Sequence, residues 1–346
     1  MNKIVVFQTW GIGDMVMATP MLGALRQRMP NAEITVIAGS REAADVIDGS
    51  YLCDHVRIIS LRKIGFIRLV REFRLIKKDH FDTALICTRI SPCVAQCLKL
   101  FSKVGIIAGD GVGRRKWGYT HWRRADVRQH RVDANLGILD MILAKSEAAP
   151  LCFHIDADSK KRAADLWLKL GLGEKLVLGV HPGSSTRNGA SKRIPLRLCL
   201  SISANFLERF PNARVMIVLG PSDSDILSAL AGVDARISIV HNTPIRITGS
   251  LISRMRMFVA GDTGLGHIAA SQGISVITLA GPTQVSATSP RGDNTIVIRS
   301  NEEVSCMPCY DTKKYGYCRH HNRCMESISD KQVMDAITVM YDRGKN

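Results

Sequence analysis

One pattern, found twice along this chain, restricts its fold more than any other feature. A short apolar run is followed by a glycine-rich turn, a helical segment and a second apolar run. The first copy covers residues 3–38 and turns at Gly11-Ile12-Gly13-Asp14, and the second covers 257–282 and turns at Gly261-Asp262-Thr263-Gly264. Strands and helices that alternate in this way form parallel sheets with helices packed on their faces. The chain is therefore predicted to be an α/β protein.

The length of 346 residues suits two domains better than a single core. Residues 146–150 have the composition of a linker. We therefore place the boundary there, with one domain over residues 1–150 and a second over 151–346. Ligands in open α/β sheets bind beyond the carboxyl ends of the strands, which predicts a site between the two domains.

The spacing of apolar residues predicts the remaining elements. Strands are expected over residues 3–7, 34–38, 56–60, 83–87, 104–108, 176–180, 214–219, 237–240 and 257–260. Helices are expected over residues 15–29, 61–80, 131–144, 159–170, 196–209, 247–255 and 329–342, the last capped by Ser329.

The net charge of +16 is large for a chain of this size. Such an excess predicts an anionic partner, which could be nucleic acid, an anionic membrane surface or a phosphorylated substrate. Two stretches contribute strongly, an amphipathic segment at 61–78 and a stretch rich in Arg and Trp at 114–124. Cations mixed with Trp and Tyr suit nucleic acid. The plain alternative is a solvated surface without a partner.

No apolar run is long enough to cross a bilayer. The N-terminal residues lack the apolar core and cleavage site of a signal peptide, so we expect a cytoplasmic protein. The ten cysteines are then expected to be reduced thiols.

Asp14 is the first candidate for chemistry. It opens a helix whose free amides and dipole favour an ionised carboxylate. Such a carboxylate, placed in a cleft, can accept the proton of an attacking hydroxyl. The alternative is that Asp14 only caps its helix. The nearby Gly11 and Gly13 are weak signs of a dinucleotide site, because Val16 occupies the third glycine position.

Two segments of the second domain have the composition of a phosphate site. The hydroxyls and amides of residues 183–186 can donate to a diphosphate, and the Lys192 ammonium can offset the charge of a leaving phosphate. The turn at 262–267 offers Asp262, Thr263 and His267 beside the free amides of a helix start. Ordinary capped turns are the alternative, although two glycines in a first helical turn cost stability unless a close approach needs them.

Four of the ten cysteines fall within 19 residues: Cys306, Cys309, Cys318 and Cys324. Four thiolates can bind zinc or iron tetrahedrally and would hold a loop-rich segment together. His320 and His321 could replace a cysteine as ligand. Free thiols on a surface loop are the alternative.

Taken in order, these motifs resemble glycosyltransferase family 9, the ADP-heptose:lipopolysaccharide heptosyltransferases. The likeness rests on Trp10-Gly11-Ile12-Gly13-Asp14-Met15, His181-Pro182-Gly183 to Lys192-Arg193-Ile194-Pro195, Gly261 to Ala270 with Gly281-Pro282-Thr283, and Cys306-Met307-Pro308-Cys309 through Cys324 to Ile328-Ser329. Order and spacing match over nearly the whole chain, which identifies the family but not the acceptor.

The resemblance implies a GT-B fold, two Rossmann-like domains with parallel sheets facing a central cleft. The first domain would bind the acceptor and the second the nucleotide-sugar donor. An acceptor hydroxyl would displace ADP from the sugar C1 with inversion, and Asp14 matches the family's proposed general base. The donor-binding positions would be Gly183, Ser184, Ser185, Thr186, Lys192, Asp262, Thr263, Gly264, His267, Gly281 and Pro282. No metal is expected in the chemistry, because Lys192 and backbone amides can take the leaving-group charge.

The resemblance also implies an acceptor, a lipid-anchored anionic oligosaccharide of the lipopolysaccharide inner core at the cytoplasmic face of the inner membrane. Basic residues of the first domain would meet its phosphates and anionic headgroups, and nucleic acid is not expected. The acceptor candidates are Gly13, Arg62, Arg89, Arg114, Arg115, Arg123 and Arg124. The stretch Cys87-Thr88-Arg89-Ile90-Ser91-Pro92 departs from the more polar loop of commoner members.

Three other functions stay open at this point. A GT-B epimerase would process a nucleotide sugar without an acceptor. A basic nucleic-acid-binding protein would leave the loops at 183–195 and 261–283 unexplained. A scaffold held together by metal would carry no catalysis.

Overall fold

The computed structural model describes residues 2–61, 65–111, 117–184, 190–310, 312, 315 and 318–343. The chain divides into two compact units, Met1–His154 and Ile155–Asn346. The change of unit therefore falls after residue 154, close to the linker composition at residues 146–150.

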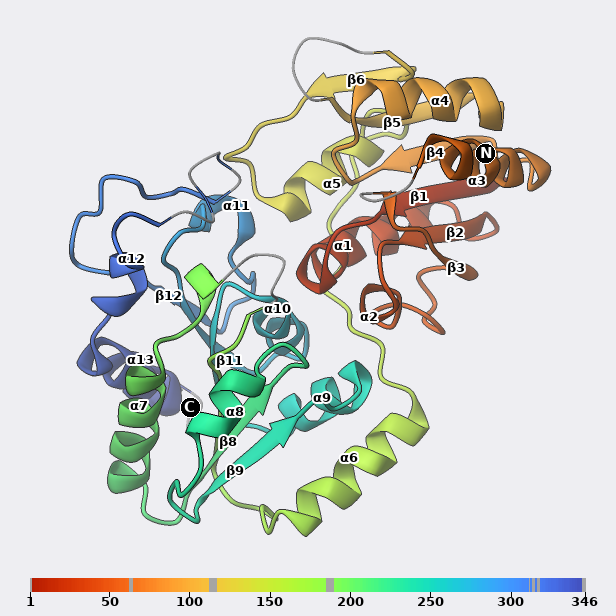
Figure 1. Ribbon diagram of the computed structural model, residues 1–346. Coiled ribbons are helices and arrows are strands. Elements are labelled where there is room, and N and C mark those ends of the chain that lie inside the picture. The colour runs from red at the N-terminus through yellow and green to blue at the C-terminus, as the bar shows by residue number, and fades with distance from the viewer. Residues whose placement is uncertain are drawn as a thin grey trace. The chain divides into compact units, whose positions relative to one another are not determined.

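The described residues of the first unit form a six-stranded parallel sheet in the order β3-β2-β1-β4-β5-β6 (Figure 1). Its strands are β1 (Lys3–Gln8), β2 (Glu33–Ala38), β3 (His55–Ile58), β4 (Thr83–Ile86), β5 (Ile106–Gly111) and β6 (His121–Arg124). Its helices are α1 (Ile12–Arg28), α2 (Arg41–Ala44), α3 (Phe66–Lys78), α4 (Pro92–Ser102) and α5 (Arg131–Leu139).

The described residues of the second unit form another six-stranded parallel sheet, in the order β12-β11-β10-β7-β8-β9. Its strands are β7 (Val177–His181), β8 (Arg214–Leu219), β9 (Ile237–His241), β10 (Met257–Gly261), β11 (Ser275–Leu279) and β12 (Thr295–Ile298). Its helices are α6 (Ala157–Lys169), α7 (Leu196–Arg209), α8 (Ser224–Ala229), α9 (Ile245–Ile252), α10 (Gly264–Ser271), α11 (Val285–Thr288), α12 (Arg323–Glu326) and α13 (Asp330–Arg343), with a 3₁₀ turn, η3, at Ala190–Lys192.

Both sheets reverse their strand order at the same step of the connectivity. The reversal lies between β1 and β4 in the first unit and between β7 and β10 in the second. Loops that leave the carboxyl ends of two such strands diverge and open a crevice, which is where ligands of open α/β sheets bind. The glycine-rich turn at 11–14 follows β1, and the turn at 261–264 follows β10. The predicted α/β fold is confirmed, and each repeated pattern lies at one of these switch points.

The hydrophobic pattern explains most elements directly. The central strands are buried along nearly their full length, because helices cover both faces of each sheet. In α3 only the stripe Leu69, Phe73 and Ile76 is buried, as its helical spacing predicts. The closing helix α13 starts as expected, since the Gln332 amide donates to the Ser329 hydroxyl at 3.3 Å.

Two expectations about local structure were wrong, and one long helix was not predicted. The helix expected over 131–144 ends at Leu139. No helix was expected over α4, although Ser91 caps it by accepting from the Val94 amide at 3.3 Å and Pro92 occupies its first turn. Residues 121–124, grouped with a basic surface stretch, form the edge strand β6 and pair with β5.

Among the helices in the described part of the chain, none has the length and apolar character needed to cross a bilayer.

The start of α6 gives a stability prediction. The amide and hydroxyl of Ser159, together with Arg246, hydrogen-bond Asp156 and lower its pKa to about 2. Because the folded pKa lies below the ordinary value of 3.8, this stabilisation is complete above about pH 4 and is lost as the pH falls through the folded value. We expect Asp156→Ala to cost about 1 kcal/mol at pH 7 and less at pH 3, measured by urea unfolding.

Asp158→Ala is the control for this experiment. Asp158 lies in the same helical turn, but its side chain is 74% exposed. Its loss should change stability by less than about 0.5 kcal/mol. A cost of Asp156→Ala that is the same at both pH values would contradict the assignment.

Candidate active site

Lys192 lies at the centre of the second unit's switch point. It ends η3, between β7 and α7, and only 7% of the residue is exposed. Its ammonium donates to the Asp262 carbonyl oxygen at 3.2 Å. A Cβ on Gly261 would lie 2.5 Å from the Lys192 carbonyl oxygen, so only glycine lets the two loops approach this closely. The structure therefore brings Lys192 and the turn after β10 together, as predicted.

Asp262 is a buried carboxylate with partners on both oxygens. Oδ2 accepts from the Thr288 hydroxyl at 2.6 Å, and Oδ1 lies 3.6 Å from His267 Nε2. Burial alone would raise the pKa of Asp262, but His267, the Lys192 charge and Thr288 together lower it. Asp262 is thus held ionised, and its charge compensates the buried ammonium.

Several polar atoms around this cluster have no protein partner. Within the described residues, the Thr263 hydroxyl, the Thr283 hydroxyl and His267 Nδ1 are buried without a hydrogen bond. A buried polar atom left unpaired costs about 1–3 kcal/mol. Three of them on the segments that follow the neighbouring strands β10 and β11 indicate a surface built to meet a polar ligand, and α10 adds the free amides of its first turn.

The loop after β7 is anchored from the neighbouring strand β8. Arg193 donates to Asp223 Oδ1 at 3.2 Å and to the Ser222 carbonyl at 2.9 Å. The other Asp223 oxygen accepts from the Gly220 amide at 2.9 Å. A Cβ on Gly183 would lie 2.0 Å from this carboxylate. Asp223 therefore holds the loop that carries Lys192, a role that the sequence did not predict.

The other predicted donor residues lie near this cluster or outside the described chain. Ser184 is buried in the loop after β7. Gly264 is the first residue of α10, and Gly281 and Pro282 follow β11, which pairs with β10. Ser185 and Thr186 lie outside the described residues.

Asp14 lies in the first turn of α1, at the switch point of the first unit. The helix cap is Gly11, which has an extended backbone, so Asp14 is not the capping residue. The carboxylate is half-buried and lies where the helix dipole favours a negative charge. Trp10 precedes this turn, and the guanidinium of Arg131, at the start of α5, lies 5.0 Å from the centre of its ring. Arg131 is a buried cation that the sequence did not predict.

The acceptor candidates differ in their surroundings. Gly13 shares the first turn of α1, and Arg89 follows β4, the neighbour of β1. Arg124 is exposed at the end of β6. Arg123 is engaged within the fold, because it bonds Asp110 and the Ala134 carbonyl, each at 2.6 Å, and so ties β5, β6 and α5 together. The other predicted positions lie outside the described residues: Arg62, Arg114 and Arg115.

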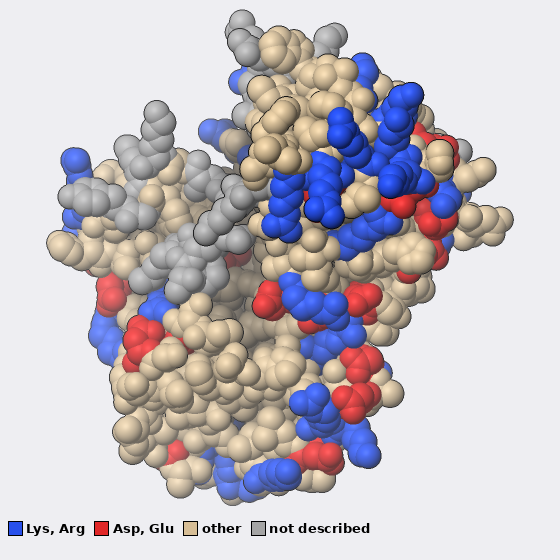
Figure 2. All heavy atoms as spheres, turned by 45° about the vertical axis from the view of Figure 1, so that its right-hand side comes forward, with Lys and Arg blue, Asp and Glu red and all other residues tan. Residues whose placement is uncertain are grey.

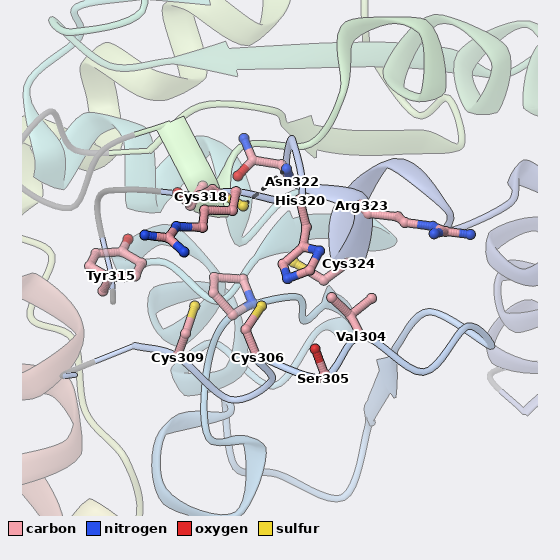
Figure 3. Close-up of a pocket in the computed structure, with 13 residues that line it drawn as sticks. Val304, Ser305, Cys306, Cys309, Tyr315, Cys318, His320, Asn322, Arg323 and Cys324 are labelled. Carbon is pink, nitrogen blue, oxygen red and sulfur yellow. Dashed lines mark hydrogen bonds between the residues drawn. The ribbon is translucent and has the colours of Figure 1, made fainter. Parts of the chain in front are cut away.

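The Cys-rich segment, residues 304–328, surrounds a cavity of about 450 Å³ (Figure 3). All four predicted thiols line it, together with one residue next to Lys192 and one of the loop after β11: Cys306, Cys309, Cys318, Cys324, Ser191 and Pro282. Burial, followed by the charges of the other three thiols, raises the pKa of Cys324 to about 11. The thiols are gathered, but among the described side chains no three His, Cys, Asp or Glu are arranged to hold a metal ion.

Comparisons with known proteins agree with this architecture. The model of glycosyltransferase family 9 (heptosyltransferase) matches residues 71–318. Lipooligosaccharide heptosyltransferase 2 of Campylobacter jejuni is 24% identical, covering 97% of this chain and 98% of the relative.

Two solved structures share the fold over almost their full length. A family 9 glycosyltransferase from Veillonella parvula has a TM-score of 0.80 at 18% identity, covering 98% of this chain and 97% of that one. The ADP-heptose lipopolysaccharide heptosyltransferase II of E. coli has a TM-score of 0.74 at 17% identity, with both chains fully covered. The family match spans well over half of the sequence, and these folds are GT-B folds built from two Rossmann-like units. This chain is a GT-B glycosyltransferase that belongs to glycosyltransferase family 9.

Proposed function

We propose that this glycosyltransferase transfers a heptose from ADP-heptose, with inversion, to a lipid-anchored anionic oligosaccharide of the lipopolysaccharide inner core. The observation that carries the proposal is the buried Lys192 ammonium, which lies among unpaired polar atoms at the switch point of the second unit. The names of the Campylobacter and E. coli relatives support the choice of sugar and acceptor.

The donor diphosphate would lie against Lys192 and the first turn of α10. The ammonium and the free amides would offset the negative charge that grows on the leaving ADP. The Thr263 and Thr283 hydroxyls and His267 Nδ1 would complete their hydrogen bonds with the sugar or phosphate. His267 would be oriented for this by its other nitrogen, which faces Asp262.

Asp14 would act on the acceptor. As the acceptor oxygen forms its bond to the heptose C1, the bond from C1 to the phosphate oxygen breaks and ADP leaves. The Asp14 carboxylate would accept the proton that the acceptor hydroxyl loses. Gly13, Arg89 and Arg124, and the undescribed Arg62, Arg114 and Arg115, would contribute to the acceptor side.

The variants Asp14→Ala and Lys192→Ala test the two roles separately. Asp14→Ala should lower transfer at least 100-fold, because general-base catalysis is lost, and should leave the Kd for ADP within about twofold. Lys192→Ala should weaken ADP binding about 10- to 100-fold through loss of a charged hydrogen bond. Transfer to truncated core lipids is read by mass spectrometry, and ADP binding by calorimetry.

Lys169→Ala is the matched control, because Lys169 is exposed on α6. Full transfer by Asp14→Ala would remove Asp14 as the base, and unchanged ADP binding by Lys192→Ala would remove the donor site. Turnover of ADP-heptose without an acceptor would favour an epimerase instead.

The first unit carries a surface suited to an anionic membrane. The helices α3 and α4 present exposed cations: Arg68, Arg71, Arg74, Lys77, Lys78 and Lys99. Glu72 is the one acidic residue in the two helices. Exposed apolar side chains lie on the same helices, with Phe66 65%, Ile67 86% and Leu100 62% exposed. Figure 2 shows Lys and Arg gathered on one face of the first unit. We assign this surface to the leaflet that anchors the acceptor.

Vesicle binding tests this assignment. The triple variant Arg68→Glu, Arg71→Glu, Lys78→Glu should bind vesicles containing phosphatidylglycerol at least tenfold more weakly than the unmodified protein, since each cation contributes about 1 kcal/mol. The same change at Lys160, Lys161 and Lys169 on α6 is the control and should have a smaller effect. Absence of binding by the unmodified protein at low salt, or equal binding by both triple variants, would contradict the assignment.

The Cys-rich segment is proposed to bind one structural zinc or iron ion. Four sulfur donors that line one cavity suit either metal, although the sulfur atoms would have to move together to coordinate it. The ion would hold the segment against the donor loops and take no part in transfer.

Metal analysis of anaerobically purified protein tests this site. We expect about one equivalent of zinc or iron per chain in the unmodified protein. The double variant Cys306→Ser, Cys318→Ser should lose the metal and have a lower Tm. Cys93→Ser is the control, because Cys93 is an exposed thiol of the first unit. Less than about a tenth of an equivalent of either metal in the unmodified protein would contradict the site.

A further inference from the structure

Tyr310 belongs to the Cys-rich segment but contacts the central residue of the proposed donor site. The Lys192 Nζ lies 3.8 Å from the centre of the Tyr310 ring. An ammonium over an aromatic face is attracted by the ring quadrupole, and the attraction is strongest where water is excluded. Lys192 is almost fully buried, so this contact is of the stronger kind.

The Tyr310 ring is held in place by its own backbone and by a neighbouring ring. The amides of Cys309 and Tyr310 both donate to the Pro282 carbonyl, each at 3.0 Å. The Tyr315 ring meets Tyr310 edge to face, with the ring centres 4.9 Å apart and the planes at 84°. The backbone of Tyr310 is thus fixed to the loop after β11, and its ring is packed against Tyr315 of the Cys-rich segment.

A neutral ring suits this position better than a carboxylate would. An anion beside Lys192 would neutralise the ammonium and repel a phosphate, whereas a ring stabilises the cation and adds no negative charge. The carboxylate of Asp262 already compensates the lysine, and its own pKa is lowered in part by the Lys192 charge. Tyr310 therefore orients the cation without adding a second negative charge beside it.

The Cys-rich cavity touches both ends of this contact. Ser191, which precedes Lys192, and Pro282, which anchors Tyr310, line the cavity with the four thiols. A Cβ on Gly281 would lie 2.9 Å from Cys324 Sγ and 2.7 Å from Met325. The Cys-rich segment therefore packs tightly against the loop after β11 at Gly281. Because Tyr310 belongs to this segment, a shift of the segment would move Tyr310 relative to Lys192.

We propose that Tyr310 is a positioning residue for Lys192 and that the Cys-rich segment sets the affinity for a nucleoside diphosphate through it. This rests on the function proposed above, in which Lys192 holds the donor diphosphate. Tyr310 acts on the ligand through the lysine and not by direct contact.

The affinity of the full-length protein for ADP tests the proposal. Tyr310→Leu should weaken ADP binding about tenfold, because the ring is lost. Tyr310→Phe keeps the ring and should bind ADP within about twofold of the unmodified protein. Tyr315→Leu, which removes the ring that packs edge to face on Tyr310 and leaves the Tyr310 ring itself in place, should weaken binding less than Tyr310→Leu.

A double-mutant cycle separates positioning from a general structural effect. In the Lys192→Ala background, Tyr310→Leu should cause no further loss of ADP affinity. A further loss of the same size in that background, or a Tyr310→Phe variant as weak as Tyr310→Leu, would overturn the proposal.

The cycle also distinguishes this inference from the proposed function. If Lys192→Ala weakens ADP binding and Tyr310→Leu does not, the inference fails and the donor site stands. If Lys192→Ala leaves ADP binding unchanged, the donor site fails and the inference fails with it.

Discussion

A buried ammonium must be compensated, and in the second unit this requirement organises three loops. Lys192 comes from the loop after β7, its compensating residue Asp262 follows β10, and Tyr310 is bonded to the loop after β11. The order β11-β10-β7 makes these strands neighbours, so the loops at their carboxyl ends bring Lys192, Asp262 and the anchor of Tyr310 to one place. A buried ammonium is stable only where compensating groups lie beside it, and the strand order of this sheet places those groups next to Lys192.

The two units use a buried carboxylate differently. In the first, the Asp110–Arg123 pair joins two strands to a helix and is consumed within the fold. In the second, Asp262 is shared among Thr288, His267 and the charge of Lys192, and polar atoms beside it stay unpaired. The Asp110 carboxylate stabilises the fold, whereas the polar atoms that stay unpaired beside Asp262 can still form hydrogen bonds with a ligand.

The sequence predicted those features that depend on neighbouring residues. The alternation of apolar runs and glycine turns predicted parallel α/β sheets, and composition pointed to the segments at 183–192 and 262–267, which the fold brings together at Lys192. Asp223 and Tyr310 were missed because their importance comes from contacts with Arg193 and Lys192, which no local pattern encodes. Arg123 was chosen for its charge alone, and its partner Asp110 lies on another strand.

The C-terminal end of the Cys-rich segment is part of the interior of the second unit. Cys324, Met325 and Ile328 are buried in the same hydrophobic core as the strands of the sheet, and Gly281 leaves no space between them and the loop after β11. In a core this closely packed, a change of volume on one side must be matched on the other. A larger residue in place of Cys324 would therefore require a compensating change in the loop after β11.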